Sequence, residues 1–178
     1  EDIPTYMIPH SIDQRDLPKE CLLDDDLYFI DTKTFPVRRG IDIATSYNVK
    51  FLSPMGYMHS HDEYLKFMCK AGNLILPARG GDFEIQVLEA LAMGMRVYVS
   101  KRKIFDYVDD VYKVFPIDGE YCLTEYGNDI YQKGCYDNVI RIDNLPNVPK
   151  PDPSYYISHY NYKEKAKKFL KMINNAGL

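Results

Sequence analysis

Residues 74–100, LILPARGGDFEIQVLEALAMGMRVYVS, decide the fold because they predict a strand, a loop, a helix and a second strand in succession. Residues 74–76 are a short apolar run closed by a proline, which is typical of a buried strand. Residues 84–93 carry apolar side chains at helical spacing, and Gly94 ends that pattern. Residues 96–99 are again short and apolar. Such a strand–helix–strand unit is the building block of a parallel sheet that is covered on both faces.

The same alternation extends over the rest of the 178 residues and shows no internal repeat. Further strands are expected at 5–8, 27–30, 49–52, 112–115 and 138–142, and helices at 41–47, 61–70, 104–108 and 162–174, the last after a proline-rich connector at 145–153. The sequence therefore predicts one α/β domain over residues 1–178, with a doubly wound, Rossmann-like parallel sheet. Sheets of this kind bind ligands beyond the carboxyl ends of their strands.

Composition excludes several classes of protein. Hydrophobic residues make up 46% of the chain, which is enough for a packed core and argues against disorder. The formal net charge is −4 and the basic residues form no long run, so nucleic acid is not expected as a partner. The sequence contains no apolar run of membrane-spanning length and no signal-peptide pattern. Four scattered cysteines, Cys21, Cys69, Cys122 and Cys135, favour reduced thiols, so we expect a cytoplasmic protein.

The loop and helix within residues 74–100 are the best candidate for a binding site. The amino end of a helix starting near Glu84 presents free backbone N–H groups that can hold an anion. Gly80 and Gly81 would let the backbone approach such a ligand closely. Glu89 falls at the edge of the apolar arc of this helix, where a half-buried carboxylate could accept hydrogen bonds from a vicinal diol such as a ribose. The alternative for Glu89 is an ordinary acid that stabilises the helix.

Residues 81–100 resemble the signature of the family 4 retaining glycosyltransferases, EGFGxPxLEAMAxGxPVxxS. The flanks are similar as well: residues 49–52 resemble the family's VxFLG strand, and residues 6–13 its VIPNGVD entry strand. The closing helix also has a counterpart, in residues 159–173. The resemblance implies the donor-binding, C-terminal half of a two-domain fold known as GT-B.

The resemblance also implies roles for individual residues. Glu89 matches the glutamate that holds the nucleotide ribose, and Lys33 and Arg39 resemble two cations that clamp the diphosphate; without the resemblance, both would be interpreted as solvated loop residues. The expected catalytic residues are therefore Lys33, Arg39 and Glu89, and the expected donor-binding residues are Gly80, Gly81, Asp82, Phe83, Glu84, Ile85 and Glu89. With these groups no metal and no cofactor are expected.

This chain departs from the family signature at two positions. Gly81 stands where the family has its first glutamate, so that contact is missing unless Asp82 substitutes for it, and Glu84 stands at a glycine position. A segment between residues 41 and 48 is also shorter than the corresponding strand–helix unit. These departures are compatible with a diverged enzyme or with one that has lost its activity.

The expected function is transfer of a sugar, with retention of configuration, from a nucleotide-diphosphate sugar to an acceptor. The acceptor site would lie on an N-terminal domain in the same or another chain, so this domain alone is expected to be inactive. The chain starts at Glu1 rather than Met, which is compatible with a partial chain. A degenerate module with a structural or interaction role is the alternative, and a nucleotide-sugar epimerase of the same architecture is a weaker one.

Two other groupings are discounted. Asp24, Asp25 and Asp26 precede a strand, so we expect a solvated turn rather than a metal motif. His59 and His61 lack a third ligand with suitable spacing and are expected to be loop or helix-cap residues.

Overall fold

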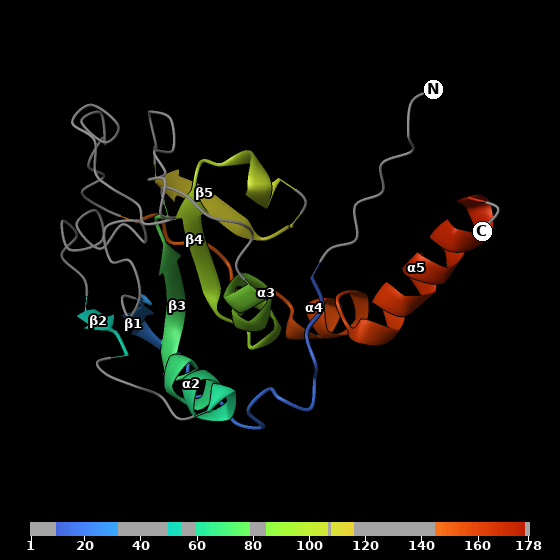
Figure 1. The fold of residues 1–178 in the computed structure, drawn as a ribbon. Coiled ribbons are helices and arrows are strands. Elements are labelled where there is room, and N and C mark those ends of the chain that lie inside the picture. The colour runs from blue at the N-terminus through green and yellow to red at the C-terminus, as the bar shows by residue number, and fades with distance from the viewer. Residues whose placement is uncertain are drawn as a thin grey trace, which may run out of the picture.

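The computed structural model describes residues 10–31, 50–54, 60–78, 85–106, 108–115 and 145–176. Within these ranges the chain forms a parallel sheet with helices packed against it, and a long C-terminal helix that projects from the body (Figure 1). The α/β class predicted from the sequence is therefore confirmed.

The sheet has five strands, all parallel. In chain order they are β1 (Asp24–Phe29), β2 (Lys50–Leu52), β3 (Ala71–Leu76), β4 (Arg96–Ser100) and β5 (Val111–Phe115), and their order in the sheet is β2-β1-β3-β4-β5. All six residues of the central strand β3 are buried, which explains why its sequence is apolar without alternation. Leu74 and Leu76 contribute to one core and Ile75 to the other, so both faces of the strand are covered.

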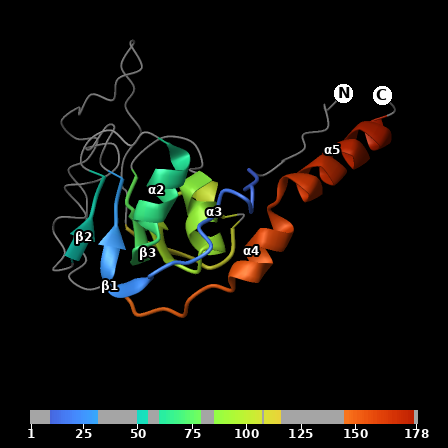
Figure 2. The same ribbon diagram turned by 90° about the horizontal axis from the view of Figure 1, so that it is seen from below.

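Helices α2 (His61–Met68) and α3 (Ile85–Ala92) lie side by side over one face of the sheet (Figure 2). Their buried side chains, such as Leu65 and Leu88, form the larger core with the strands. Ser60 caps α2 by accepting a hydrogen bond from the Glu63 amide; Ser60 and Asp62 are the two residues near the helix start whose types favour a cap, and the structure selects Ser60. The chain then leaves α3 through Gly94, whose φ of +84° is a conformation that favours glycine.

The opposite face of the sheet carries a smaller core of Ile30, Ile75, Tyr98, Phe115 and Val148. Among the residues that the structure describes, this face is covered by the extended segment 145–150 and not by a helix. Double winding requires helices on both faces, so that part of the fold stays a prediction. The predicted elements at 5–8, 41–47 and 138–142 lie outside the described residues.

Strand order places the topological switch point between β1 and β3. From β1 the chain moves outward to β2 on one side, whereas β3, β4 and β5 follow on the other side. In such sheets ligands bind in the crevice outside the carboxyl ends of the two strands that flank the switch. Here those ends are Phe29 and Leu76.

Two sequence expectations are corrected. Asp24, Asp25 and Asp26 are not a turn but the exposed first half of β1, because Asp24 pairs with β3 and the Asn73 amide binds the carbonyls of Asp25 and Leu27. The connector predicted at 145–153 ends one residue early, because Asp152 caps a helix, α4 (Pro153–His159), that the sequence analysis missed. The final helix α5 (Tyr162–Ala176) is confirmed, and a short 3-10 helix, η1 (Lys103–Phe105), occupies the start of the predicted helix at 104–108.

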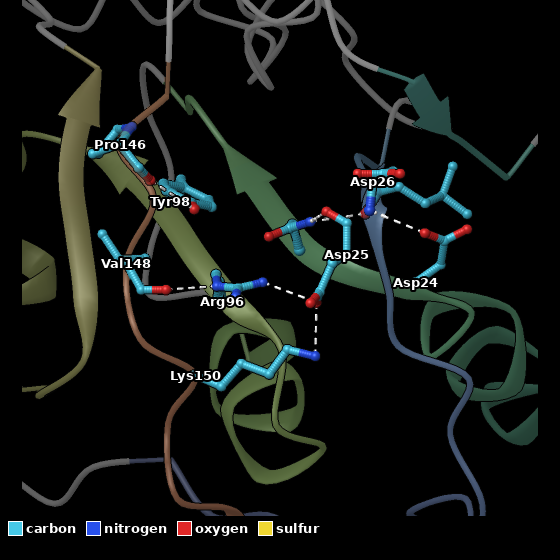
Figure 3. Close-up of polar contacts among 10 residues, drawn as sticks. Asp24, Asp25, Asp26, Arg96, Tyr98, Pro146, Val148 and Lys150 are labelled. Carbon is cyan, nitrogen blue, oxygen red and sulfur yellow. Dashed lines mark hydrogen bonds and ion pairs between the residues drawn. The ribbon is translucent and has the colours of Figure 1, made fainter.

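Arg96 fastens the segment 145–150 to the sheet (Figure 3). Its Nε donates to the Val148 carbonyl at 2.6 Å and its Nη1 to Asp25 at 2.9 Å. Lys150 reaches the same Asp25 oxygen at 2.7 Å, and the two cations together lower the pKa of Asp25, Lys150 contributing most. Tyr98 adds a hydrogen bond from its hydroxyl to the Pro146 carbonyl. Hydrogen bonds and ion pairs from β1 and β4 therefore hold the segment 145–150 against this face of the sheet.

Replacing Arg96 by methionine should destabilise the fold by about 1–3 kcal/mol, because a mostly buried carbonyl loses its donor while the side-chain stem is kept. The matched control is Lys150→Met, which removes one exposed ion pair and should cost about 0–1 kcal/mol. Urea unfolding measures both. Equal effects of the two variants would show that Arg96 is only a surface ion-pair partner.

Candidate functional site

Glu89 is a buried acid, and within the described part of the chain one of its carboxylate oxygens is unsatisfied. It lies one helical turn after Ile85 on α3 and is 4% exposed. Its Oε1 lies 2.7 Å from Nε2 of His61, whereas its Oε2 has no hydrogen-bond partner among the residues that the structure describes. Burial raises the pKa of Glu89, although His61 opposes the shift. An unpartnered buried oxygen of this kind costs about 1–3 kcal/mol unless something else binds it.

His61 connects the start of α2 to the middle of α3. It is the first residue of α2, its side chain is 51% exposed, and its ring stacks on Tyr64 at a centroid distance of 6.1 Å. The Tyr64 hydroxyl in turn donates to Oε1 of Gln86 on α3 at 2.9 Å. Two cross-helix hydrogen bonds therefore hold α2 and α3 in register, and they fix the position of the Glu89 carboxylate.

A pocket of about 290 Å³ opens beside this pair. Its lining comes from the N-terminal segment 11–17 and from helices α2, α3 and α5: Ser11, Ile12, Asp13, Arg15, Asp16, Leu17, His61, Ile85, Glu89 and Tyr162. The segment is held in place by Ile12, whose amide donates to the Tyr160 carbonyl at 2.8 Å. The pocket is therefore a built feature of the fold, with a wall from each end of the chain.

Acidic groups outnumber basic ones in this pocket. Asp13, Asp16 and Glu89 face Arg15 and His61, and the Arg15 guanidinium is hydrogen-bonded to Asp13, whose pKa it lowers to about 2. Because Arg15 is already neutralised, the pocket does not suit a phosphate. It suits a neutral ligand that donates hydrogen bonds, such as the hydroxyls of a sugar, to the carboxylate oxygens.

The structure describes only some of the predicted site residues. Glu89 lines a pocket together with segment 11–17, and at 4% exposure it is buried, whereas the sequence predicts a half-buried carboxylate. Ile85 is the first residue of α3 that the structure describes, and it lies 41% exposed on the pocket rim. Lys33, Arg39, Gly80, Gly81, Asp82, Phe83 and Glu84 lie outside the described residues.

Several pocket residues were missed by the sequence analysis. His61 is not merely a helix-cap residue but the partner of Glu89, and 28 residues separate the two in sequence, so no spacing rule connects them. Arg15 and Tyr162 come from opposite ends of the chain and meet with the guanidinium 5.9 Å from the ring centroid. Only the folded chain reveals these pairings.

Ser100 has a clear structural role next to the site. At the end of β4 it is fully buried and its hydroxyl donates to the Ala78 carbonyl at 2.8 Å. This bond fixes the backbone just after β3, where the chain enters the glycine-containing loop of the predicted site. The serine of the family-like signature thus orients the entry to that loop.

Comparisons with protein-family models, with curated proteins and with solved structures find no match to this chain. Within the described part of the chain, no group of three or more His, Cys, Asp or Glu side chains is arranged to hold a metal ion. No helix in that part is both long and apolar enough to cross a membrane.

The raised pKa of Glu89 predicts a pH dependence of stability. Between the unfolded value of 4.5 and the higher folded pKa, the folded state binds more protons than the unfolded state, so stability falls as pH rises through this window. Glu89→Gln cannot ionise, so it should gain stability relative to the parent protein from pH 4 to pH 7. Urea unfolding across this range is the measurement.

Glu164→Gln is the matched control for this experiment. Glu164 on α5 is exposed and pairs with Lys167, which lowers its pKa, so the substitution should bring no gain in stability as pH rises. A constant difference between Glu89→Gln and the parent protein at all pH values would contradict the raised pKa.

Proposed function

We propose that this chain is the donor-binding half of a GT-B glycosyltransferase that transfers a sugar from a nucleotide-diphosphate sugar with retention of configuration. The observation that carries the proposal is the buried Glu89 carboxylate, which lines a pocket and keeps one oxygen without a partner among the described residues. That oxygen can accept a hydrogen bond from one hydroxyl of a ribose diol. The resemblance of residues 81–100 to the family 4 signature assigns the same role to Glu89.

Phosphate groups would bind away from the acidic pocket, toward the switch point. The chain that leaves β1 at Phe29 contains Lys33 and Arg39, and the chain that leaves β3 at Leu76 contains residues 80–84. On this proposal those two segments supply the cations and backbone amides for the pyrophosphate, together with the amino end of α3. The nucleoside occupies the pocket at Glu89, so charge is separated along the ligand: neutral at one end and anionic at the other.

The catalytic contribution proposed for this half of the enzyme is electrostatic. Stabilising the departing diphosphate lowers the barrier to cleavage of the bond between the sugar and the phosphate, and it requires no group on this half to change its protonation state. The acceptor and any catalytic base belong to an N-terminal half in the same or another chain. The proposed compartment is the cytoplasm, where nucleotide sugars are made.

One observation favours a degenerate, non-catalytic module as the second candidate. Oε1 of Glu89 is already bonded to His61, so a diol that uses both carboxylate oxygens must displace the imidazole. His61 is half exposed at the start of its helix, so its ring has room to move outward. If the His61–Glu89 bond is instead permanent, it serves only to join α2 to α3.

Calorimetry with UDP and GDP separates these two candidates. Donor binding predicts measurable affinity for at least one nucleotide, and Glu89→Ala should weaken it roughly tenfold or more, because a hydrogen bond to a charged group contributes about 1.5–3 kcal/mol. Glu63→Ala, at an exposed acid on α2 outside the pocket, is the matched control and should leave affinity unchanged.

Failure to bind either nucleotide at millimolar concentration would contradict the proposal and favour the degenerate module. Equal weakening by Glu89→Ala and Glu63→Ala would show that net charge, and not the pocket carboxylate, controls the affinity.

A further inference from the structure

Helix α5 is the least embedded element of the described chain. It projects beyond the sheet and beyond helices α2 to α4 in both views (Figures 1 and 2). None of the side chains of residues 162–175 is buried. Tyr162, Phe169 and Leu170 are 47%, 46% and 59% exposed, so this one helix exposes three large apolar side chains.

These apolar side chains lie on one face of the helix. They recur at helical spacing and form a continuous stripe, which consists of Tyr162, Ala166, Phe169, Leu170 and Ile173. Lys163 and Lys165 flank the stripe, whereas Lys167, Lys168 and Lys171 lie toward the opposite face. The helix is therefore amphipathic although its apolar face has no core to pack against among the described residues.

Charge on α5 is opposite to that of the whole chain. Five lysines and one acid, Glu164, give the helix a net charge of +4, whereas the chain has a net charge of −4. Lysines that flank an apolar stripe can lay their hydrocarbon stems along it and extend their ammonium groups toward an anionic surface. A helix of 15 residues is about 22 Å long, so the stripe and the lysines act over one continuous surface.

We propose that α5 binds the surface of an anionic phospholipid membrane. The helix lies in the plane of the interface, with Phe169 and Leu170 among the acyl chains and the flanking lysines at the lipid phosphates. Nucleic acid would neutralise the lysines but leave the apolar stripe in water. A purely apolar partner would bury the stripe but leave the flanking cations without counter-charges. An anionic membrane matches both features at once.

Docking of α5 on a membrane would also bring the pocket at Glu89 near that membrane. Tyr162, the first residue of α5, also lines the pocket at Glu89. A ligand bound in that pocket would therefore lie close to the membrane surface. This consequence does not depend on the nature of the ligand, and the membrane proposal does not depend on the proposed function.

Vesicle co-sedimentation of the full 178-residue chain tests the proposal. The chain should bind phosphatidylcholine vesicles that contain phosphatidylserine and should bind pure phosphatidylcholine vesicles roughly tenfold or more weakly. Raising the salt from about 0.1 to 1 M shortens the Debye length from about 10 to 3 Å and should reduce binding to the anionic vesicles.

Substitutions on α5 separate the contribution of the apolar stripe from that of the flanking lysines. Phe169→Ser with Leu170→Ser should reduce vesicle binding roughly tenfold or more, and Lys163→Gln with Lys165→Gln should reduce both the binding and its salt dependence. Leu22→Ser is the matched control, because Leu22 is an apolar side chain outside α5 that is 73% exposed. It should leave binding unchanged, and circular dichroism establishes that each variant is folded.

Three results would overturn the proposal: no binding to anionic vesicles, equal binding to both vesicle types, or equal effects of Leu22→Ser and the double serine variant. Light scattering could give a fourth result that overturns it. A dimer that the double serine variant dissociates, together with absence of vesicle binding, would assign the stripe to contact with a second copy of the chain.

Discussion

The hydrogen bond between His61 and Glu89 is the constraint on which the candidate site depends. It joins the first residue of α2 to the middle of α3 at 2.7 Å, in the wall of a pocket that the N-terminal segment also lines. Because only one carboxylate oxygen takes part, the other is buried without a partner among the described residues. A buried carboxylate oxygen without a partner destabilises the fold relative to an apolar side chain in the same place. The presence of Glu89 here therefore favours a binding role for it.

The sheet explains how the seam between α2 and α3 is positioned. β3 is buried along its whole length and pairs with β1 and β4, so α2 and α3, which precede and follow β3, start at the same edge. The strand order reverses between β1 and β3, and the switch point lies at the carboxyl ends of these two strands. Glu89 and the carboxyl ends of β1 and β3, at Phe29 and Leu76, therefore belong to the same end of the sheet.

Sequence patterns predicted the parts of the fold that local chemistry controls. The apolar runs at β3 and β4, the Ser60 cap and the glycine at the end of α3 each follow from a few neighbouring residues. The pattern also singled out Glu89, because its place on the helical wheel is a local property. His61, Arg15 and Tyr162 could not be predicted as pocket residues, since their positions depend on packing between distant segments. The acids of β1 were misinterpreted as a turn for the same reason: their strand pairing comes from β3, more than 40 residues away in sequence.

The central claim is that Glu89 accepts hydrogen bonds from the two ribose hydroxyls of a nucleotide. The direct test is a comparison of UDP with its 2′,3′-dideoxy analogue, measured by calorimetry in the parent protein and in Glu89→Gln. The account predicts that the parent protein prefers UDP roughly tenfold or more and that the preference largely disappears in Glu89→Gln. Equal affinity of the parent protein for both nucleotides, or an unchanged preference in the variant, would contradict it.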